Sequence, residues 1–170
     1  MYIVFGDEIV DSNEIKLLIE NNSNFVVNKD MTKGTKREDT IAFQISIKIN
    51  ELNSFIKESY GLEDIDKEYI FSEYMTITDE LAMDLEHLFS EDIIINARAY
   101  KLDNSEDDIK AILVISHKEL GKLKLLDITK RLLTQLDWFK LSDYFILAIQ
   151  LKNFKWFFSC IARYLYFIKL

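Results

Sequence analysis

The stretch TIAFQISIKI, residues 40–49, decides the fold of this chain. Its large apolar side chains stand on alternate positions, at Ile41, Phe43, Ile45, Ile47 and Ile49. Because successive side chains of a strand point to opposite faces, a period of two predicts a β-strand. No other stretch of the chain carries so clear a strand pattern, and we expect the remaining elements to pack around it.

A β-hairpin and a helix are predicted ahead of this strand. Residues 2–5 favour β-structure, residues 6–7 suit a turn, and residues 8–10 can return as a second strand. Ser12 or Asn13 can cap a helix whose apolar side chains repeat at spacings of three and four. The charged residues 28–40 that follow are predicted to form a solvated loop.

Helices and strands alternate after the central strand. The pattern predicts a helix over 50–60 that ends at Gly61, an acidic linker over 62–68, a helix capped by Thr78, strands at 93–95 and 111–116 around an acidic loop at 103–108, and a helix over 123–136. No repeat or low-complexity tract divides the chain. We therefore expect one α+β domain over residues 1–170, with an N-terminal hairpin and helix, central strands and a hydrophobic helix pair at the C-terminus.

The last part of the chain, FILAIQLKNFKWFFSCIARYLYFIKL (145–170), is strongly apolar. Lys152 and Lys155 divide it into two runs, and neither reaches the ~18 apolar residues that a transmembrane helix needs. A helical wheel places Lys155, Arg163 and Tyr166 on one narrow polar strip. A helix this apolar is typical of a core; a partner groove or dimer face is the second interpretation, and contact with a membrane surface is disfavoured because such helices have a wider polar face.

Charge and cysteine content narrow the classes of function. The net charge is -8, divided into -12 for residues 1–137 and +4 for residues 138–170. An acidic body repels phosphates and disfavours nucleic-acid binding. The one cysteine, Cys160, excludes an internal disulfide and a cysteine-rich zinc site, and its aromatic neighbours indicate a buried side chain. The first residues lack a basic, then apolar, signal pattern, so we expect an intracellular protein of the cytoplasm or nucleus.

Motifs that would indicate an enzyme are incomplete. His117 and Glu119 have the His-x-Glu spacing of zinc deaminases, but those enzymes also need a Pro-Cys-x-x-Cys pair, and the chain has no proline. Asp84, His87 and Glu91 could share a metal from one helix, yet no second pair completes such a site and a solvated helical face is favoured. No glycine-rich phosphate loop follows a strand. We expect no catalytic, cofactor or metal site, and a protein that is not an enzyme.

Three stretches carry a family resemblance. IVFGDEIVDSNEIKLLIENNSNF (3–25) is similar to an opening hairpin and first helix, and INELNSFIKESYG (49–61) to a helix that ends in Tyr-x-Gly. LSDYFILAIQLKNFKWFFSCIARYL (141–165) is similar to a pair of terminal helices, with Ala148 and Leu151 at the positions of an AAxxL pattern. Together they resemble the BTB/POZ fold, the family that includes the Skp-type and elongin-type adaptors of cullin ubiquitin ligases.

The resemblance implies an adaptor that works by homodimerisation or by binding a cullin-like or receptor partner. It also implies an insertion at about residues 61–120 relative to a minimal domain of that family. An alternative of another class is a small acidic structural or inhibitory protein of a virus or parasite that covers a basic surface on a larger assembly. A third hypothesis is a hydrolase or metal enzyme without a recognisable motif.

Five residues are our candidates for partner contact. Trp138 and Phe139 are predicted to lie in a short link between helices, and Lys155, Arg163 and Tyr166 form the polar strip of the last helix. Aromatic and arginine side chains are the types that interface hot spots favour. The alternative for Trp138 and Phe139 is that they fill the core, since large aromatic side chains are usually buried.

Overall fold

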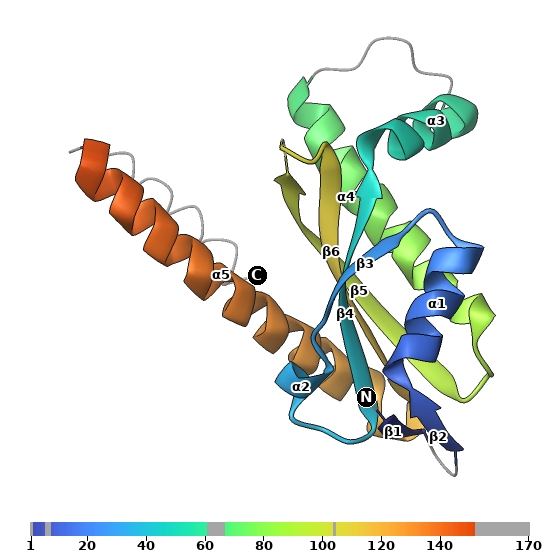
Figure 1. Cartoon of the computed structure of the whole chain (residues 1–170). Coiled ribbons are helices and arrows are strands. Elements are labelled where there is room, and N and C mark those ends of the chain that lie inside the picture. Colours follow the sequence, from blue (N-terminus) through green and yellow to red (C-terminus); the bar gives the residue numbers. More distant parts are fainter. Residues whose placement is uncertain (1, 6–7, 61–66, 104, 152–170) are drawn as a thin grey trace. The chain divides into compact units, whose positions relative to one another are not determined.

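The computed structural model describes residues 2–5, 8–60, 67–103 and 105–151 (Figure 1). Contacts divide the chain into two compact units, residues 1–132 and residues 133–170. The first unit holds two antiparallel sheets and most of the helices, so the predicted α+β class is confirmed.

The elements follow one another in a mixed order. They are β1 (Tyr2–Phe5), β2 (Glu8–Asp11), α1 (Ser12–Asn22), β3 (Val26–Asp30), α2 (Thr32–Thr35), β4 (Thr40–Lys48), α3 (Ile49–Tyr60), α4 (Lys67–Asp84), the 3-10 helix η1 (Leu85–Leu88), β5 (Ile93–Asp103), β6 (Asp108–His117), the 3-10 helix η2 (Lys118–Leu120) and α5 (Lys122–Leu151).

The main sheet is antiparallel, with the strand order β3-β4-β6-β5. The predicted strand at 40–49 is confirmed as β4, one of the two central strands. β4 pairs with β6 along its whole length, from Thr40 opposite Ser116 to Lys48 opposite Asp108. β5 and β6 form a hairpin through the predicted acidic loop. Residues 93–117, within the region expected as an insertion, therefore supply two of the four strands of this sheet.

Both faces of the central strands are buried. One face carries the alternating side chains of β4 and β6, such as Phe43 and Leu113, which share one core with apolar residues of α1, α3 and α4. On the other face Ala42, Ile112 and Val114 are fully buried as well. α2 and the first turns of α5 cover this second face, and the side-chain amide of Asn96 on β5 donates a hydrogen bond to the Thr129 hydroxyl of α5 at 2.8 Å.

The predicted hairpin and first helix are present, with a different helix cap. β1 and β2 pair in register, and α1 begins directly after them. The cap is Asp11, whose carboxylate accepts the backbone N–H of Asn13 at 3.2 Å. Ser12 is buried instead, and its hydroxyl donates to the Asp30 carboxylate at 2.8 Å. The Ser12 hydroxyl therefore bonds to β3 and does not cap α1.

The loop predicted over residues 28–40 is wrong in part. It includes the end of β3 and the short helix α2, where Thr32 and Thr35 are fully buried. The Thr32 backbone N–H donates to the Asp30 carboxylate at 2.8 Å, and the Thr35 hydroxyl donates to the Thr32 carbonyl at 2.7 Å. These short-range bonds satisfy polar groups inside the protein, so a polar composition does not indicate solvation here.

Two predicted helix boundaries are wrong. Thr78 lies inside α4, which begins at Lys67, and therefore caps nothing. Trp138 and Phe139 were expected in a link between helices, but a single helix, α5, runs through both positions. The prediction of a terminal helix pair extends beyond Leu151, outside the described residues. None of the described helices combines the length and the apolar character that crossing a bilayer requires.

Substitution of Thr78 tests whether this residue lies inside α4 or caps a helix. Its side chain is fully buried and its hydroxyl oxygen has no hydrogen-bond partner among the described residues. Replacement by the isosteric valine (Thr78→Val) removes this unsatisfied group, so we expect the free energy of unfolding to rise by about 1 kcal/mol. Urea denaturation measures the change. A helix cap at this position would give a loss of similar size instead.

The matched control is Thr76→Val, two residues earlier on the same helix and on its exposed side. Thr76 is exposed and its hydroxyl donates to the Ser72 carbonyl at 3.1 Å. We expect this substitution to change the free energy of unfolding by less than about 0.5 kcal/mol. Equal effects of the two substitutions would contradict the burial-based explanation.

Candidate interaction surface

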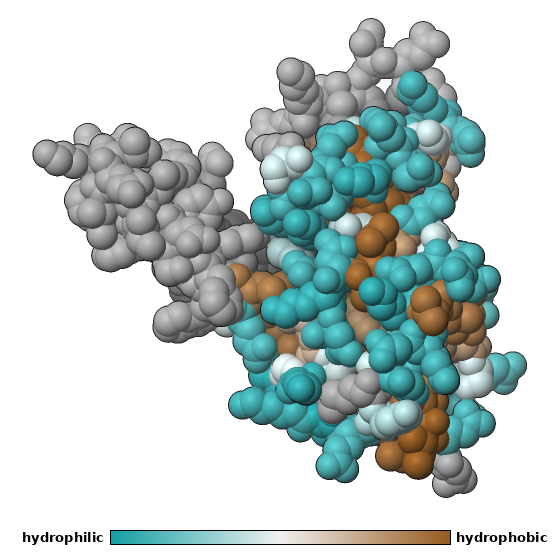
Figure 2. Space-filling model, in the orientation of Figure 1, coloured by the Kyte–Doolittle hydropathy of each residue, from teal (hydrophilic) through white to brown (hydrophobic). Residues whose placement is uncertain are grey.

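The hairpin β1–β2 has one apolar face that the protein leaves open. Val4 lies opposite Ile9, and Tyr2 lies on the same face two residues earlier. Tyr2, Val4 and Ile9 are 75%, 45% and 73% exposed, respectively. We call these three side chains the outer hairpin face. Figure 2 shows a brown surface over the hairpin, in contrast to the largely teal surface around it.

The opposite face of the same hairpin is anchored in the core. Ile3 is 1% exposed, and Phe5 is buried beside it. The Val4 backbone N–H also donates to the Glu38 carbonyl at 2.9 Å, which joins β1 to the segment before β4. The outer hairpin face is therefore held on a fixed support.

Other large exposed apolar side chains are spread over separate elements. They are Leu17 on α1, Val26 on β3, Phe55 on α3, Phe71 and Met83 on α4, and Leu123 and Leu126 on α5. Single exposed apolar residues are normal on protein surfaces, whereas a contiguous group indicates a binding surface. Among the residues that the structure describes, the hairpin is where three such side chains share one short, regular face.

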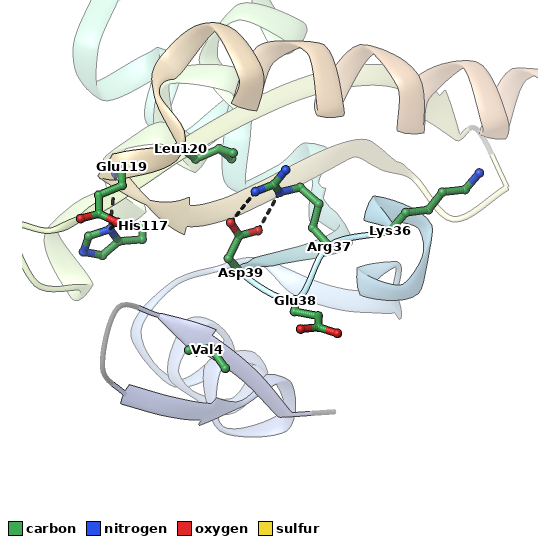
Figure 3. Close-up of a pocket in the computed structure, with 8 residues that line it drawn as sticks. All are labelled: Val4, Lys36, Arg37, Glu38, Asp39, His117, Glu119 and Leu120. Carbon is green, nitrogen blue, oxygen red and sulfur yellow. Dashed lines mark hydrogen bonds and ion pairs between the residues drawn. The ribbon is translucent and has the colours of Figure 1, made fainter.

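A hollow of about 530 Å³ adjoins the outer hairpin face at Val4 (Figure 3). Its other walls come from the segment before β4 and from the end of β6, at Lys36, Arg37, Glu38, Asp39, His117, Glu119 and Leu120. The lining is mainly charged and its mouth is open. It does not have the enclosed apolar walls that are typical of a small-molecule site.

The charges in the hollow are organised by one ion pair. The Arg37 Nε donates to Asp39 Oδ1 at 2.7 Å, and Nη2 donates to Oδ2 at 2.5 Å. The Thr40 hydroxyl adds a third bond to the same carboxylate at 3.1 Å. Hydrogen bonds from Arg37 lower the pKa of Asp39 below its usual value, against the opposing effect of partial burial. Asp39 is thus a negative charge that is already bonded to Arg37 and Thr40.

Backbone contacts tie this segment to the central strands. The Ser116 hydroxyl donates to the Asp39 carbonyl at 2.7 Å and lies 3.3 Å from the Thr40 hydroxyl. Lys36 has a left-handed backbone with φ of 57°, and its N–H closes α2 on the Lys33 carbonyl at 3.3 Å. The position of residues 36–39, and with it the support of the hairpin, is therefore set by the ends of β4 and β6.

The histidine motifs serve local structure. His117 Nδ1 accepts the backbone N–H of Glu119 at 3.4 Å and so caps η2. Asp84 ends α4, while His87 belongs to η1 and Glu91 lies in the turn beyond, so the three predicted to share one helix do not. In the part of the chain that the structure describes, no group of three or more His, Cys, Asp or Glu side chains is placed to hold a metal.

The predicted contact residues are not placed by the structure. Trp138 and Phe139 are in α5, but their side chains lie outside the described residues, as do Lys155, Cys160, Arg163 and Tyr166 altogether. They remain predictions. The outer hairpin face was missed, although the sequence contains a signal for it. Residues 2–5 and 8–10 are apolar at nearly every position, whereas a two-stranded sheet with one buried face needs apolar side chains only at alternate positions.

Comparison of the chain with protein-family models, with curated proteins and with solved structures gave no match.

The contribution of the Arg37–Asp39 pair to folding stability should depend on pH. Because the folded pKa of Asp39 lies below its ordinary value of 3.8, the pair stabilises the protein above pH 3.8 and loses this effect as pH falls through the folded pKa. We expect Arg37→Gln to raise the Asp39 pKa toward 3.8 and to lower stability only above that pH. Since both side chains are more than a third exposed, the loss should stay below about 1 kcal/mol.

Carboxyl chemical shifts recorded against pH by NMR measure the Asp39 pKa. Arg98→Gln is the matched control, since Arg98 pairs with Asp79 at 3.1 Å and not with Asp39. An Asp39 pKa that is the same in wild type and Arg37→Gln would show that the ion pair does not hold in solution.

Proposed function

We propose that this chain is a non-enzymatic protein–protein interaction adaptor and that it contacts its partner through the outer hairpin face. The observation that carries the proposal is the exposure of Tyr2, Val4 and Ile9 on one face of a hairpin whose other face is buried. Covering adjacent apolar side chains is favourable by about 25 cal/mol per Å². Aromatic and aliphatic side chains surrounded by polar residues are the usual composition of an interface centre.

The support of the face favours binding. Ile3 and Phe5 fix the hairpin from below, and the Val4–Glu38 bond fixes its edge. A surface that is already ordered loses little conformational entropy when a partner covers it, so more of the contact energy appears as affinity. The open, charged hollow beside Val4 then supplies a polar rim.

The BTB/POZ resemblance adds support of a different kind. The stretch 3–25, which is similar to the family's opening hairpin and first helix, forms β1, β2 and α1 in that order. On this proposal the chain acts as a BTB-like or Skp-like subunit of a larger intracellular complex, or as a homodimer. Trp138, Phe139, Lys155, Arg163 and Tyr166 stay proposed contacts for a second surface.

A second candidate function rests on charge. Residues 1–132 hold 27 acidic and 16 basic residues, a net charge of -11. A body this acidic would also suit a structural or inhibitory protein that covers a basic surface on a larger assembly. The two candidates differ in what dominates the affinity, which is apolar burial for the adaptor and charge for the covering protein.

Substitution of the outer hairpin face tests the adaptor. In the Tyr2→Ser/Ile9→Ser double variant two exposed apolar side chains become small and polar, so we expect recovery of specific partners from source lysate to fall at least about tenfold. Light scattering of the recovered complex gives its mass. The matched control is Leu123→Ser, which removes a leucine that is 84% exposed on α5. Equal recovery by both variants, or a chain that stays monomeric and recovers nothing, would reject the proposal.

The salt dependence of partner recovery distinguishes the two candidate functions. Exposed charges are screened strongly between about 0.1 M and 1 M salt, where the Debye length falls from about 10 Å to 3 Å. We expect partner recovery to change less than about threefold over this range if the outer hairpin face dominates. Loss of recovery at high salt, with the double variant behaving as wild type, would favour the protein that covers a basic surface.

A further inference from the structure

The second strand of the hairpin has an open edge. The Val4 backbone N–H donates to Glu38, on the side of β1 that faces away from β2. In an antiparallel pair, two residues directly opposite each other both point their backbone groups toward the partner strand or both point them away. Ile9 lies opposite Val4, so its N–H and C=O point outward from the free side of β2.

Nothing in the described part of the chain covers these groups. No backbone bond from another segment reaches Ile9, and its side chain is 73% exposed. The edge of the main sheet at β5 is treated differently, because the Asp79 carboxylate accepts the Ala99 N–H and pairs with Arg98. Side chains that occupy an edge in this way prevent strand addition. Among the described residues, no side chain bonds the backbone of Ile9 in this way.

We propose that β2 accepts an extended segment of a partner protein as a third strand, and that this segment alternates apolar and basic side chains. The inference rests on the proposed function and names the class of partner. Backbone groups of Ile9 would supply hydrogen bonds, and the outer hairpin face would receive the apolar side chains of the added strand.

The acidic charge of β2 indicates that the added strand carries basic side chains. The strand reads Glu8-Ile9-Val10-Asp11, and neither β1 nor β2 holds a lysine or arginine. The Asp11 carboxylate caps α1, so Glu8 is the acidic side chain that an added strand would meet. Glu8 is exposed on the face opposite to Ile9, so a side chain beside Glu8 in the added strand lies on that face and would be basic. A second copy of this hairpin would bring acidic residues and no basic ones, which disfavours self-pairing.

The probe is a short synthetic peptide in which isoleucine alternates with lysine, added to the full chain. We expect hydrogen exchange of the Ile9 backbone amide, followed by NMR, to slow at least tenfold at saturation. The matched control peptide has the same side chains, with the backbone nitrogens of its bonding edge methylated. It keeps charge and apolar character but cannot complete a strand ladder, so Ile9 should stay unprotected. Equal protection by both peptides, or by neither, would overturn the proposal.

Ile9→Pro gives a second test within the protein. Proline removes an N–H that points outward and leaves the bonds between β1 and β2 intact, which edge strands tolerate. We expect its peptide affinity to fall at least tenfold. Ile9→Thr, which keeps the N–H and loses the apolar side chain, should retain more affinity than Ile9→Pro. A folded Ile9→Pro variant that binds as wild type does would overturn the strand-addition mechanism.

The two proposals can fail separately. If the peptide does not protect Ile9 while the Tyr2→Ser/Ile9→Ser variant still loses its partner, the adaptor function stands and strand addition is rejected. If the peptide protects Ile9 but no partner recovery depends on Tyr2 and Ile9, the proposed function is rejected.

Discussion

The pairing of β4 with β6 is the constraint on which the rest of the first unit depends. It joins segments about seventy residues apart in sequence into one continuous ladder, from Thr40 opposite Ser116 to Lys48 opposite Asp108. Both strands are covered on both faces over most of their length, so their backbone groups must bond to neighbouring strands. β3 and β5 then add to the outer sides of this pair, and helices cover its two surfaces.

The interaction surface is a consequence of where these two strands end. At that end the hydroxyls of Thr40 and Ser116 meet, and Ser116 holds the Asp39 carbonyl. Asp39 in turn holds Arg37, and its neighbour Glu38 accepts the N–H of Val4. A chain of short bonds therefore leads from the most buried strands to an exposed hairpin. Loss of this connection would leave a two-stranded hairpin, which is barely stable in water by itself.

Sequence patterns predicted the elements whose periodicity is simple. The alternation in residues 40–49 and the hairpin signal at residues 2–10 needed no knowledge of the neighbours. Thr32, Thr35 and Thr78 were misjudged because they are polar yet fully buried, and only tertiary contacts determine that. The hairpin face was missed for a related reason. Tyr2, Val4 and Ile3 look alike in sequence, and which of them is exposed depends on which side of the hairpin meets the core.

The sheet edges at β5 and at β2 differ in how the neighbouring side chains treat them. At β5 the Asp79 carboxylate is drawn into partial burial, which raises its pKa, and only the Ala99 N–H and Arg98 offset that desolvation. Guarding an edge with a half-buried charge is thus unfavourable in itself. At β2, in the part of the chain that the structure describes, the exposed Ile9 side chain lies beside backbone groups of Ile9 that no other segment bonds, an arrangement that favours addition of another strand. The exposed Glu8 restricts which strand that can be, since it repels a like-charged copy and attracts a basic segment.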